Sequence, residues 1–228
     1  MTTATYDRFR ENLTTYFDRT ASKAWEQLTS DAPVSGVRAT VRAGRNEMRG
    51  TLLSWLPADM TGLRLLDAGC GTGALAVEAA QRGAEVVAID VAGSLVKIAA
   101  DRAPAGLNID WRVGDMLDPT LGQFDHVVAM DSLIHYKAAD IVSVVRKIAD
   151  TTRGSFVFTF APQTPLLMVM LGMGRLFPSS DRSPAILPVA HQKLRSQISH
   201  ALPSATIGRD RRVSGGFYKS HALEVVLG

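Results

Sequence analysis

Three glycines at alternating positions follow a short apolar stretch of the sequence. Leu65–Ala68 leads into Gly69-Cys70-Gly71-Thr72-Gly73, and a segment rich in alanine comes next. Glycine lets the backbone turn sharply and lets a ligand approach with no Cβ in the way. A helix that begins after such a turn offers free N–H groups to a ligand. The stretch therefore predicts a nucleotide-like ligand at a strand–turn–helix junction.

The residues of this turn distinguish between two adenosyl ligands, a dinucleotide and S-adenosylmethionine. The glycines are spaced G-x-G-x-G, whereas dinucleotide-binding turns have G-x-G-x-x-G. Asp67 stands two positions before the first glycine, where a carboxylate would repel a pyrophosphate but suits an ammonium group. The turn therefore favours S-adenosylmethionine over a dinucleotide.

Acidic residues after the next two expected strands fit the remainder of that ligand. Asp90 ends the second strand, and a carboxylate there can accept hydrogen bonds from both ribose hydroxyls. Asp115 can accept from the adenine amino group, and Met116 can cover the ring and offer its backbone N–H. This order of features is far more specific than a glycine turn alone. The alternative is a sheet scaffold whose cofactor site is inactive.

Short apolar strands and amphipathic helices alternate along most of the chain. Strands are expected at 63–67, 86–90, 109–113, 124–130, 154–160, 204–210 and 221–227. Helices are expected at 74–82, 92–102, 138–150 and 190–201. Such alternation implies a parallel sheet covered on both faces. We expect an α/β fold with a doubly wound, mostly parallel seven-stranded sheet and one antiparallel member.

A helical region precedes this sheet. Residues 5–30 have the pattern of short helices, and 36–56 that of one longer helix ended by Pro57. The apolar face of the longer helix is expected to consist of Val37, Val41, Met48, Leu52 and Leu56. We therefore divide the chain into an N-terminal helical arm or lid over 1–35 and a main domain over 36–228.

The composition excludes several classes of protein. The 228 residues include 25 basic and 22 acidic ones, and a net charge of +3 is too small for a nucleic-acid-binding surface. The single cysteine, Cys70, rules out an internal disulfide, and no apolar run is long enough to span a membrane. The first residues have neither a signal-peptide core nor the composition of a transit peptide. We expect a cytoplasmic protein.

Residues 36–228 resemble the class I S-adenosylmethionine-dependent methyltransferases, a Rossmann-like family that binds its cofactor at the carboxyl ends of the strands. The resemblance implies a cofactor site made of Asp67, Gly69, Gly71, Asp90, Asp115 and Met116. It also implies that Asp131, after the fourth strand, lies beside the methionine part of the cofactor.

A finer resemblance rests on short segments spread over most of the chain. Asp131-Ser132-Leu133-Ile134-His135-Tyr136 is similar to a segment of the magnesium-protoporphyrin IX O-methyltransferases of chlorophyll and bacteriochlorophyll synthesis. The further matching segments are Tyr16-Phe17, Val41–Arg45, Phe160–Thr164, Leu176–Pro178 and Phe217–Ser220. Gln163 replaces an expected lysine and Lys137 an expected proline, and the residues after Trp25 depart from the family pattern.

This resemblance implies that a propionate of magnesium protoporphyrin IX is methylated to give the monomethyl ester. His135 is the expected catalytic residue, which would orient the propionate or take up a proton, unless it only hydrogen-bonds its loop. Tyr16 is expected on a lid over the cofactor, with a surface aromatic as the alternative. Arg42 and Arg45 are expected to pair with the second propionate, with simple exposure as the alternative. No metal site is expected, so magnesium would arrive only within the porphyrin.

Residues 163–203 are expected to cover the substrate, because the apolar, methionine-rich part of this segment suits a large flat ligand. The same stretch also suits a membrane surface or a protein core. The resemblance suggests the porphyrin-binding subunit of magnesium chelatase as substrate donor. It also suggests a peripheral contact with the inner or photosynthetic membrane.

Two other functions fit the same residues. One is methyl transfer to a quinone or phenol, for which His135 would be an obligatory base. The other is a non-enzymatic partner protein that keeps the fold. Both alternatives are compatible with the same glycine turn. The sequence therefore specifies the methyl donor more firmly than the methyl acceptor.

Overall fold

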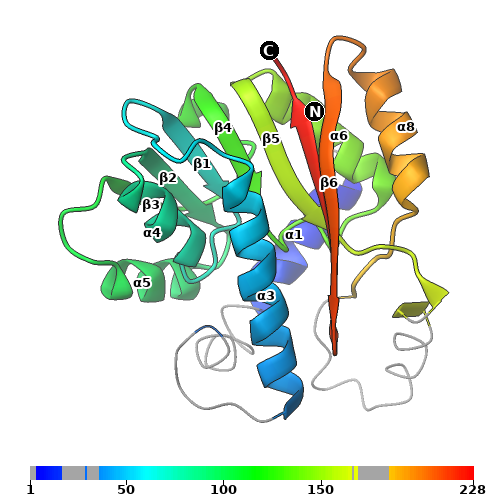
Figure 1. The fold of residues 1–228 in the computed structure, drawn as a ribbon, viewed down its shortest axis with the longest axis horizontal. Helices are drawn as coiled ribbons and strands as arrows, with labels where there is room; N and C mark the ends of the chain where they lie inside the picture. The colour runs from blue at the N-terminus through cyan, green and yellow to red at the C-terminus, as the bar shows by residue number, and fades with distance from the viewer. Residues whose placement is uncertain (1–3, 17–28, 30–35, 166, 169–184) are drawn as a thin grey trace.

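A seven-stranded sheet forms the centre of the molecule in a computed structural model that describes residues 4–16, 29, 36–165, 167–168 and 185–228 (Figure 1). The strands are β1 (Arg64–Ala68), β2 (Glu85–Asp90), β3 (Ile109–Val113), β4 (Phe124–Ala129), β5 (Thr152–Phe160), β6 (Thr206–Gly215) and β7 (Tyr218–Val226). Their order in the sheet is β3-β2-β1-β4-β5-β7-β6. Strands β1 to β5 pair in parallel, and β7 is antiparallel to both of its neighbours. The expected mostly parallel seven-stranded sheet is confirmed.

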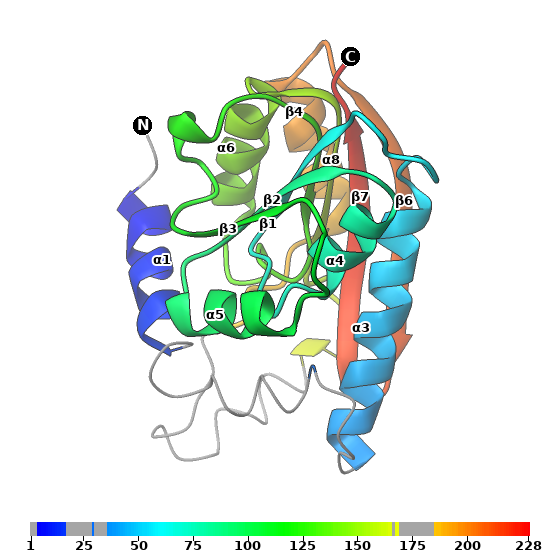
Figure 2. The same ribbon diagram turned by 90° about the vertical axis from the view of Figure 1, so that its left-hand side faces the viewer.

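Helices cover both faces of the sheet, as the strand–helix alternation predicted. They are α1 (Ala4–Tyr16), α3 (Gly36–Ser54), α4 (Ala74–Gln81), α5 (Gly93–Arg102), α6 (Ala138–Ala149) and α8 (His191–Ala201), with a short 3₁₀ turn η2 at Pro119–Leu121. Alternate residues of β1 face the two layers: Leu66 packs with α1, α6 and α8, and Leu65 with α3 and α4. Figure 2 shows α1 and α3 on opposite sides of the sheet.

The two C-terminal strands are longer than the sequence pattern indicated. Residues 204–210 and 221–227 were expected, and the structure has Thr206–Gly215 and Tyr218–Val226. The difference arises because β6 is an edge strand with the charged run Arg209–Arg212, which shows no apolar alternation. Charged residues on an edge strand also prevent pairing with other chains.

Helix α3 begins where it was expected and ends two residues earlier than predicted. Met48 and Leu52 are fully buried against the sheet. Val37 was expected on the same buried face, but it is 52% exposed. Residues 36–40 are all exposed, so the apolar face of the helix packs only from Val41 onward.

Some expectations fall outside the described residues. These are the N-terminal helical pattern beyond Tyr16, apart from Thr29, and most of the methionine-rich stretch with the loop after it. Within that stretch Leu167 is buried and Met168 is exposed. None of the described helices has the length and apolarity that crossing a bilayer requires.

A glycine brings α3 into close contact with β7. A Cβ added at Gly44 would lie 2.5 Å from Cδ1 and 2.7 Å from Cβ of Tyr218. No ordinary Cβ makes such contacts, so a larger residue would force the helix away from the strand. Gly50, one and a half turns further along α3, has nothing within 4 Å of its Cβ position.

These two glycines give a matched pair of substitutions. We expect Gly44→Ala to lower the free energy of unfolding by about 1–3 kcal/mol through overpacking. Gly50→Ala should raise it by about 0.5–1 kcal/mol, because alanine favours an exposed helix interior. Urea denaturation of both variants measures the difference. A Gly44→Ala protein as stable as Gly50→Ala would contradict this account of how α3 packs on β7.

Candidate functional site

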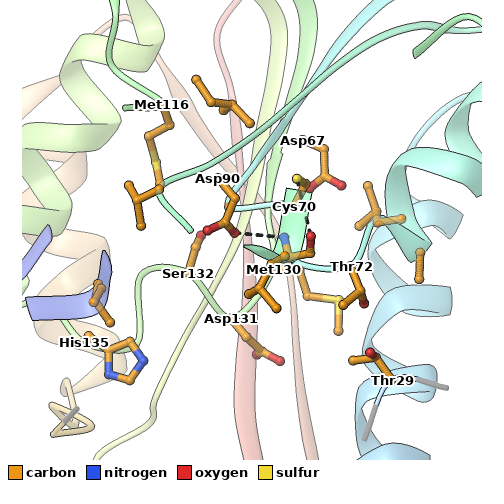
Figure 3. Close-up of a pocket in the computed structure, with 18 of the residues that line it drawn as sticks. Thr29, Asp67, Cys70, Thr72, Asp90, Met116, Met130, Asp131, Ser132 and His135 are labelled. Atoms are coloured by element: carbon orange, nitrogen blue, oxygen red, sulfur yellow. Dashed lines mark hydrogen bonds between the residues drawn. The ribbon is translucent and has the colours of Figure 1, made fainter. Parts of the chain in front are cut away.

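A cavity of about 320 Å³ lies at the carboxyl ends of the parallel strands. Its walls come from the residues that directly follow β1, β2, β3 and β4, together with side chains of α1 and α3. Figure 3 shows Asp67 and Asp90 near Cys70 of the glycine turn, with Asp131 and His135 below them in this view. The cavity lies where open α/β sheets bind their ligands.

The glycine turn has the sharply turned backbone that its sequence implied, in conformations that glycine adopts without steric cost. Gly69, Gly71 and Gly73 all have positive φ, at 85°, 53° and 79°. A Cβ at Gly69 would lie 2.4 Å from Cβ of Ser132, and one at Gly73 2.4 Å from Trp111. The turn thus packs directly on the segment after β4, and α4 begins immediately beyond it.

Asp90 holds this turn in place. The backbone N–H of Gly71 donates to Oδ2 of Asp90, and that of Ala92 to Oδ1, each at 2.9 Å. A carboxylate offers about four lone pairs, so both oxygens can still accept further hydrogen bonds. Asp90 therefore links the turn after β1 to the turn after β2, at the edge of the cavity.

Asp67 is a buried carboxylate with an unsatisfied oxygen. It is 1% exposed, and its Oδ2 has no hydrogen-bond partner among the described residues. Burial, and secondarily the charge of Asp90, raises the pKa of Asp67 to about 7, although the backbone N–H of Ala76 acts in the opposite direction. Such an oxygen suits a cationic or hydrogen-bond-donating ligand.

Asp115 is covered by helix α1. The Tyr6 hydroxyl donates to its Oδ1 at 2.7 Å, and Arg10 forms an ion pair with its Oδ2. Tyr6 also stacks on Tyr136, with the ring centroids 5.0 Å apart, and burial raises the pKa of the Tyr6 hydroxyl. The helix is thus attached over the cavity through two side chains on one of its faces.

Asp131 is the centre of a buried polar network. Its φ of 56° is unusual for a residue other than glycine, and it turns the carboxylate toward α3 and β7. Arg45 contacts Oδ2 at 2.5 Å, and the Tyr218 hydroxyl lies 2.9 Å and 3.1 Å from the two oxygens. Ser220 and Thr159 each donate to Oδ1 at 3.3 Å.

His135 lines the cavity and is 7% exposed. Its Nδ1 lies 3.2 Å from the carbonyl oxygen of Ala185. A carbonyl only accepts, so the proton belongs on Nδ1, and Nε2 is the acceptor of the neutral ring. Leu187 N–H in turn donates to Ile134 O at 2.9 Å, which fixes residues 185–187 beside the loop that carries His135.

The structure brings together most of the residues that the sequence singled out. Asp67, Gly69, Gly71, Asp90, Asp115, Met116, Asp131, His135, Arg42 and Arg45 all line one cavity. Tyr16 is the last residue of α1 and is not among the residues that line it. Arg45 pairs with Asp131, a contact that the sequence reasoning did not anticipate.

Other residues at the site were not expected from the sequence. Tyr6 and Arg10 lie four positions apart in α1, so a helical face could have paired them, but nothing pointed to Asp115 as their partner. Tyr218 and Ser220 belong to a segment noted only for its resemblance. Their period-two spacing, which places both on one face of a strand, was a usable signal.

Comparison with known proteins first defines the class. Residues 65–154 match the family model described as "Methyltransferase domain". The crystal structure of magnesium protoporphyrin IX methyltransferase from Synechocystis PCC 6803 with bound SAH superposes with a TM-score of 0.84 and 27% identity. That match covers 96% of this chain and 99% of the other. The fold is that of a class I methyltransferase.

Full-length relatives define the family more closely. Residues 129–227 match the model described as "Magnesium-protoporphyrin IX methyltransferase C-terminus". The chain is 50% identical to the magnesium-protoporphyrin O-methyltransferase of Rhodobacter capsulatus over 96% of this chain and 97% of the relative. It is 30% identical to the enzyme of that name from Synechocystis, over 92% and 93%. The chain therefore belongs to the family of magnesium-protoporphyrin O-methyltransferases.

The raised pKa of Asp67 predicts a pH-dependent cost of folding. An aspartate with a pKa near 3.9 when unfolded and about 7 when folded contributes stability at low pH that is lost as the pH rises through 7. We expect ligand-free Asp67→Asn to be more stable than the wild type at pH 8, by roughly 1–4 kcal/mol. The difference in stability between Asp67→Asn and the wild type should shrink toward pH 5.

Thermal denaturation across this pH range measures the effect, with Asp101→Asn as the control because that carboxylate is exposed. The control should differ from the wild type by a nearly constant amount. An Asp67→Asn protein that is less stable than the wild type at pH 8 would show that the buried charge carries no such cost.

Proposed function

We propose that the chain transfers a methyl group from S-adenosylmethionine to a propionate carboxylate of magnesium protoporphyrin IX, giving the monomethyl ester for bacteriochlorophyll synthesis. The observation that carries this proposal is the similarity along the whole chain to the Rhodobacter capsulatus enzyme. A quinone or phenol as acceptor has no comparable full-length support.

The residues around the cavity fit the cofactor. Asp67 would offer its unpartnered oxygen to the ammonium group, and the absence of a Cβ at Gly69 and Gly73 lets Ser132 and Trp111 pack directly on the turn beside it. Asp90 would accept from the ribose hydroxyls, with Asp115 and Met116 at the adenine. When bound, the cofactor supplies a methyl group that is already activated.

The proposed acceptor requires little acid–base chemistry. A propionate has a pKa near 4 to 5, so it is ionised at pH 7 without a strong base. The protein then has two tasks, which are to align the carboxylate and to remove water from it. The partly apolar cavity, closed on one side by α1, serves both tasks.

We assign the alignment to His135. The Ala185 carbonyl holds its Nδ1 proton, so Nε2 can accept a hydrogen bond from a propionate that arrives protonated, or donate one when the ring is charged. Either contact fixes the carboxylate beside the cofactor site.

The second propionate requires a cationic partner. Arg42 lines the cavity, and we propose that it binds this group together with Arg45, whose guanidinium also contacts Asp131. An arginine has five N–H donors in a planar fork, so it can serve two carboxylates at once.

Tyr6 and Arg10 fix α1 over Asp115. We propose that α1 and the residues after it form the lid, so the role of Tyr16 stays a prediction. We also propose that residues 163–203 cover the porphyrin. The contact of Ala185 with His135 supports this, because the end of the segment then borders the reaction site.

Delivery and location are further proposals that rest on family membership alone. We propose that the porphyrin comes from the porphyrin-binding subunit of magnesium chelatase. We also propose that the protein acts in the cytoplasm, in peripheral contact with the membrane.

The substrate is tested by incubating the protein with S-adenosylmethionine and magnesium protoporphyrin IX. We expect a product one methylene heavier than the substrate, detected by mass spectrometry, and none from a porphyrin whose propionates are both esterified. With S-adenosylmethionine saturating at every pH, the rate should change little between pH 6 and 8, because the acceptor stays ionised. Turnover of a phenol but not of magnesium protoporphyrin would refute the proposal.

His135→Ala tests the assigned alignment. We expect turnover to fall by about 100-fold while cofactor affinity changes by less than about threefold, as for a residue that acts on the acceptor. His200→Ala, at an exposed histidine of α8, is the control. Unchanged turnover in His135→Ala would remove this residue from the mechanism.

A further inference from the structure

Three side chains that commonly bind metals meet on the α6 and α8 side of the sheet, outside the methyl-transfer cavity. His191 is the first residue of α8, Asp210 lies on β6, and His221 lies on β7. One nitrogen or oxygen atom from each lies within 4.8 Å of the other two. None of the three lines the cavity, so the cluster has no part in the proposed reaction.

One nitrogen of this cluster has no hydrogen bond. His221 Nε2 lies 2.8 Å from Oδ2 of Asp210, which is a normal hydrogen bond. His191 Nε2 lies 3.7 Å from the same oxygen, which is too far for one. This nitrogen is buried and unpartnered among the described residues, a costly arrangement unless something else binds it.

Ring stacking fixes both imidazoles. The centroids of His191 and His221 lie 4.2 Å apart, and the Phe160 ring stacks on His221 at 5.1 Å. The stacked rings present their Nε2 atoms to the same carboxylate oxygen, Oδ2 of Asp210, at 2.8 Å from His221 and 3.7 Å from His191.

A guanidinium orients the carboxylate. Arg195 donates to Oδ1 of Asp210 at 3.1 Å, so Oδ2 is left on the side of the two histidines. Contacts of this kind, from a neighbour to the outer oxygen of a ligand, commonly orient ligands at metal sites.

We propose that His191, Asp210 and His221 bind a divalent transition-metal ion of the Zn²⁺ class. Two imidazole nitrogens and one carboxylate oxygen suit such ions and not Mg²⁺, which prefers oxygen ligands. In a tetrahedral site with bonds of about 2.0–2.2 Å, neighbouring ligand atoms lie about 3.3 Å apart. Asp210 Oδ2 lies 2.8 Å from His221 Nε2 and 3.7 Å from His191 Nε2, distances on either side of this spacing, and water would fill the fourth position.

The position of the site indicates a structural role. An ion there would tie the start of α8 to β6 and β7. Helix α8 directly follows residues 185–190, which contact the loop that carries His135. The ion would therefore anchor the end of the segment proposed to cover the porphyrin, without taking part in methyl transfer.

Equilibrium dialysis of the full-length, tag-free protein after EDTA treatment tests this site. We expect one equivalent of Zn²⁺ to bind and the Tm to rise by about 5 °C at a hundredfold excess over Kd. Mg²⁺ should do neither. A wild-type protein that binds no Zn²⁺ would overturn the proposal.

Substitutions locate the ion. His191→Ala and Asp210→Asn should each weaken Zn²⁺ binding by at least about tenfold and reduce the Tm shift at the same Zn²⁺ concentration to about half or less. Both residues are partly exposed, so these variants should fold, and their circular dichroism spectra verify this. His200→Ala, on the same helix but outside the cluster, should bind Zn²⁺ as the wild type does. Wild-type affinity in His191→Ala and Asp210→Asn would place the ion elsewhere and contradict the proposal.

Discussion

Four carboxylates gathered at one edge of the sheet are the constraint on which the rest of the site depends. Asp67, Asp90, Asp115 and Asp131 lie at or just beyond the carboxyl ends of β1, β2, β3 and β4, and all line one cavity. Parallel strands bring their carboxyl ends together, so the negative charges meet in a poorly solvated space. Each charge then needs a partner, because an uncompensated buried carboxylate is costly.

The protein itself compensates three of them. Backbone N–H groups bind Asp90, Tyr6 and Arg10 of α1 bind Asp115, and Arg45 of α3 binds Asp131 with Tyr218. These pairs attach both helices to the cavity. Tyr6 and Arg10 join α1 to Asp115, and α3 can lie close to β7 because Gly44 admits Tyr218. Asp67 alone among the four keeps an oxygen without a hydrogen-bond partner in the described part of the chain. We propose that the ammonium group of the methyl donor binds this oxygen.

The local sequence pattern was enough to predict the sheet and the site residues at the carboxyl ends of its strands. The strand Ile109–Val113 was predicted with its observed bounds, and the four aspartates could be placed together because each ends or follows a parallel strand. The sequence pattern did not predict the side-chain pairs between residues that are far apart in the chain. Arg10 and Asp115 are 105 positions apart and Arg45 and Asp131 are 86 apart, so neither partner is visible from its own neighbourhood. The same holds for His191, Asp210 and His221, which the chain brings together only through the packing of α8 on the C-terminal strands.

The function of the site depends most directly on what Asp67 binds. Isothermal titration calorimetry of the wild type and Asp67→Asn can compare S-adenosylmethionine with methylthioadenosine, which keeps the adenosine and sulfur but lacks the amino acid part. We expect Asp67→Asn to weaken the binding of S-adenosylmethionine by at least about tenfold, because a charged hydrogen bond is lost. The affinity for methylthioadenosine should not change. An equal loss for both ligands, or no loss for either, would contradict the assignment of the fourth carboxylate to the ammonium group.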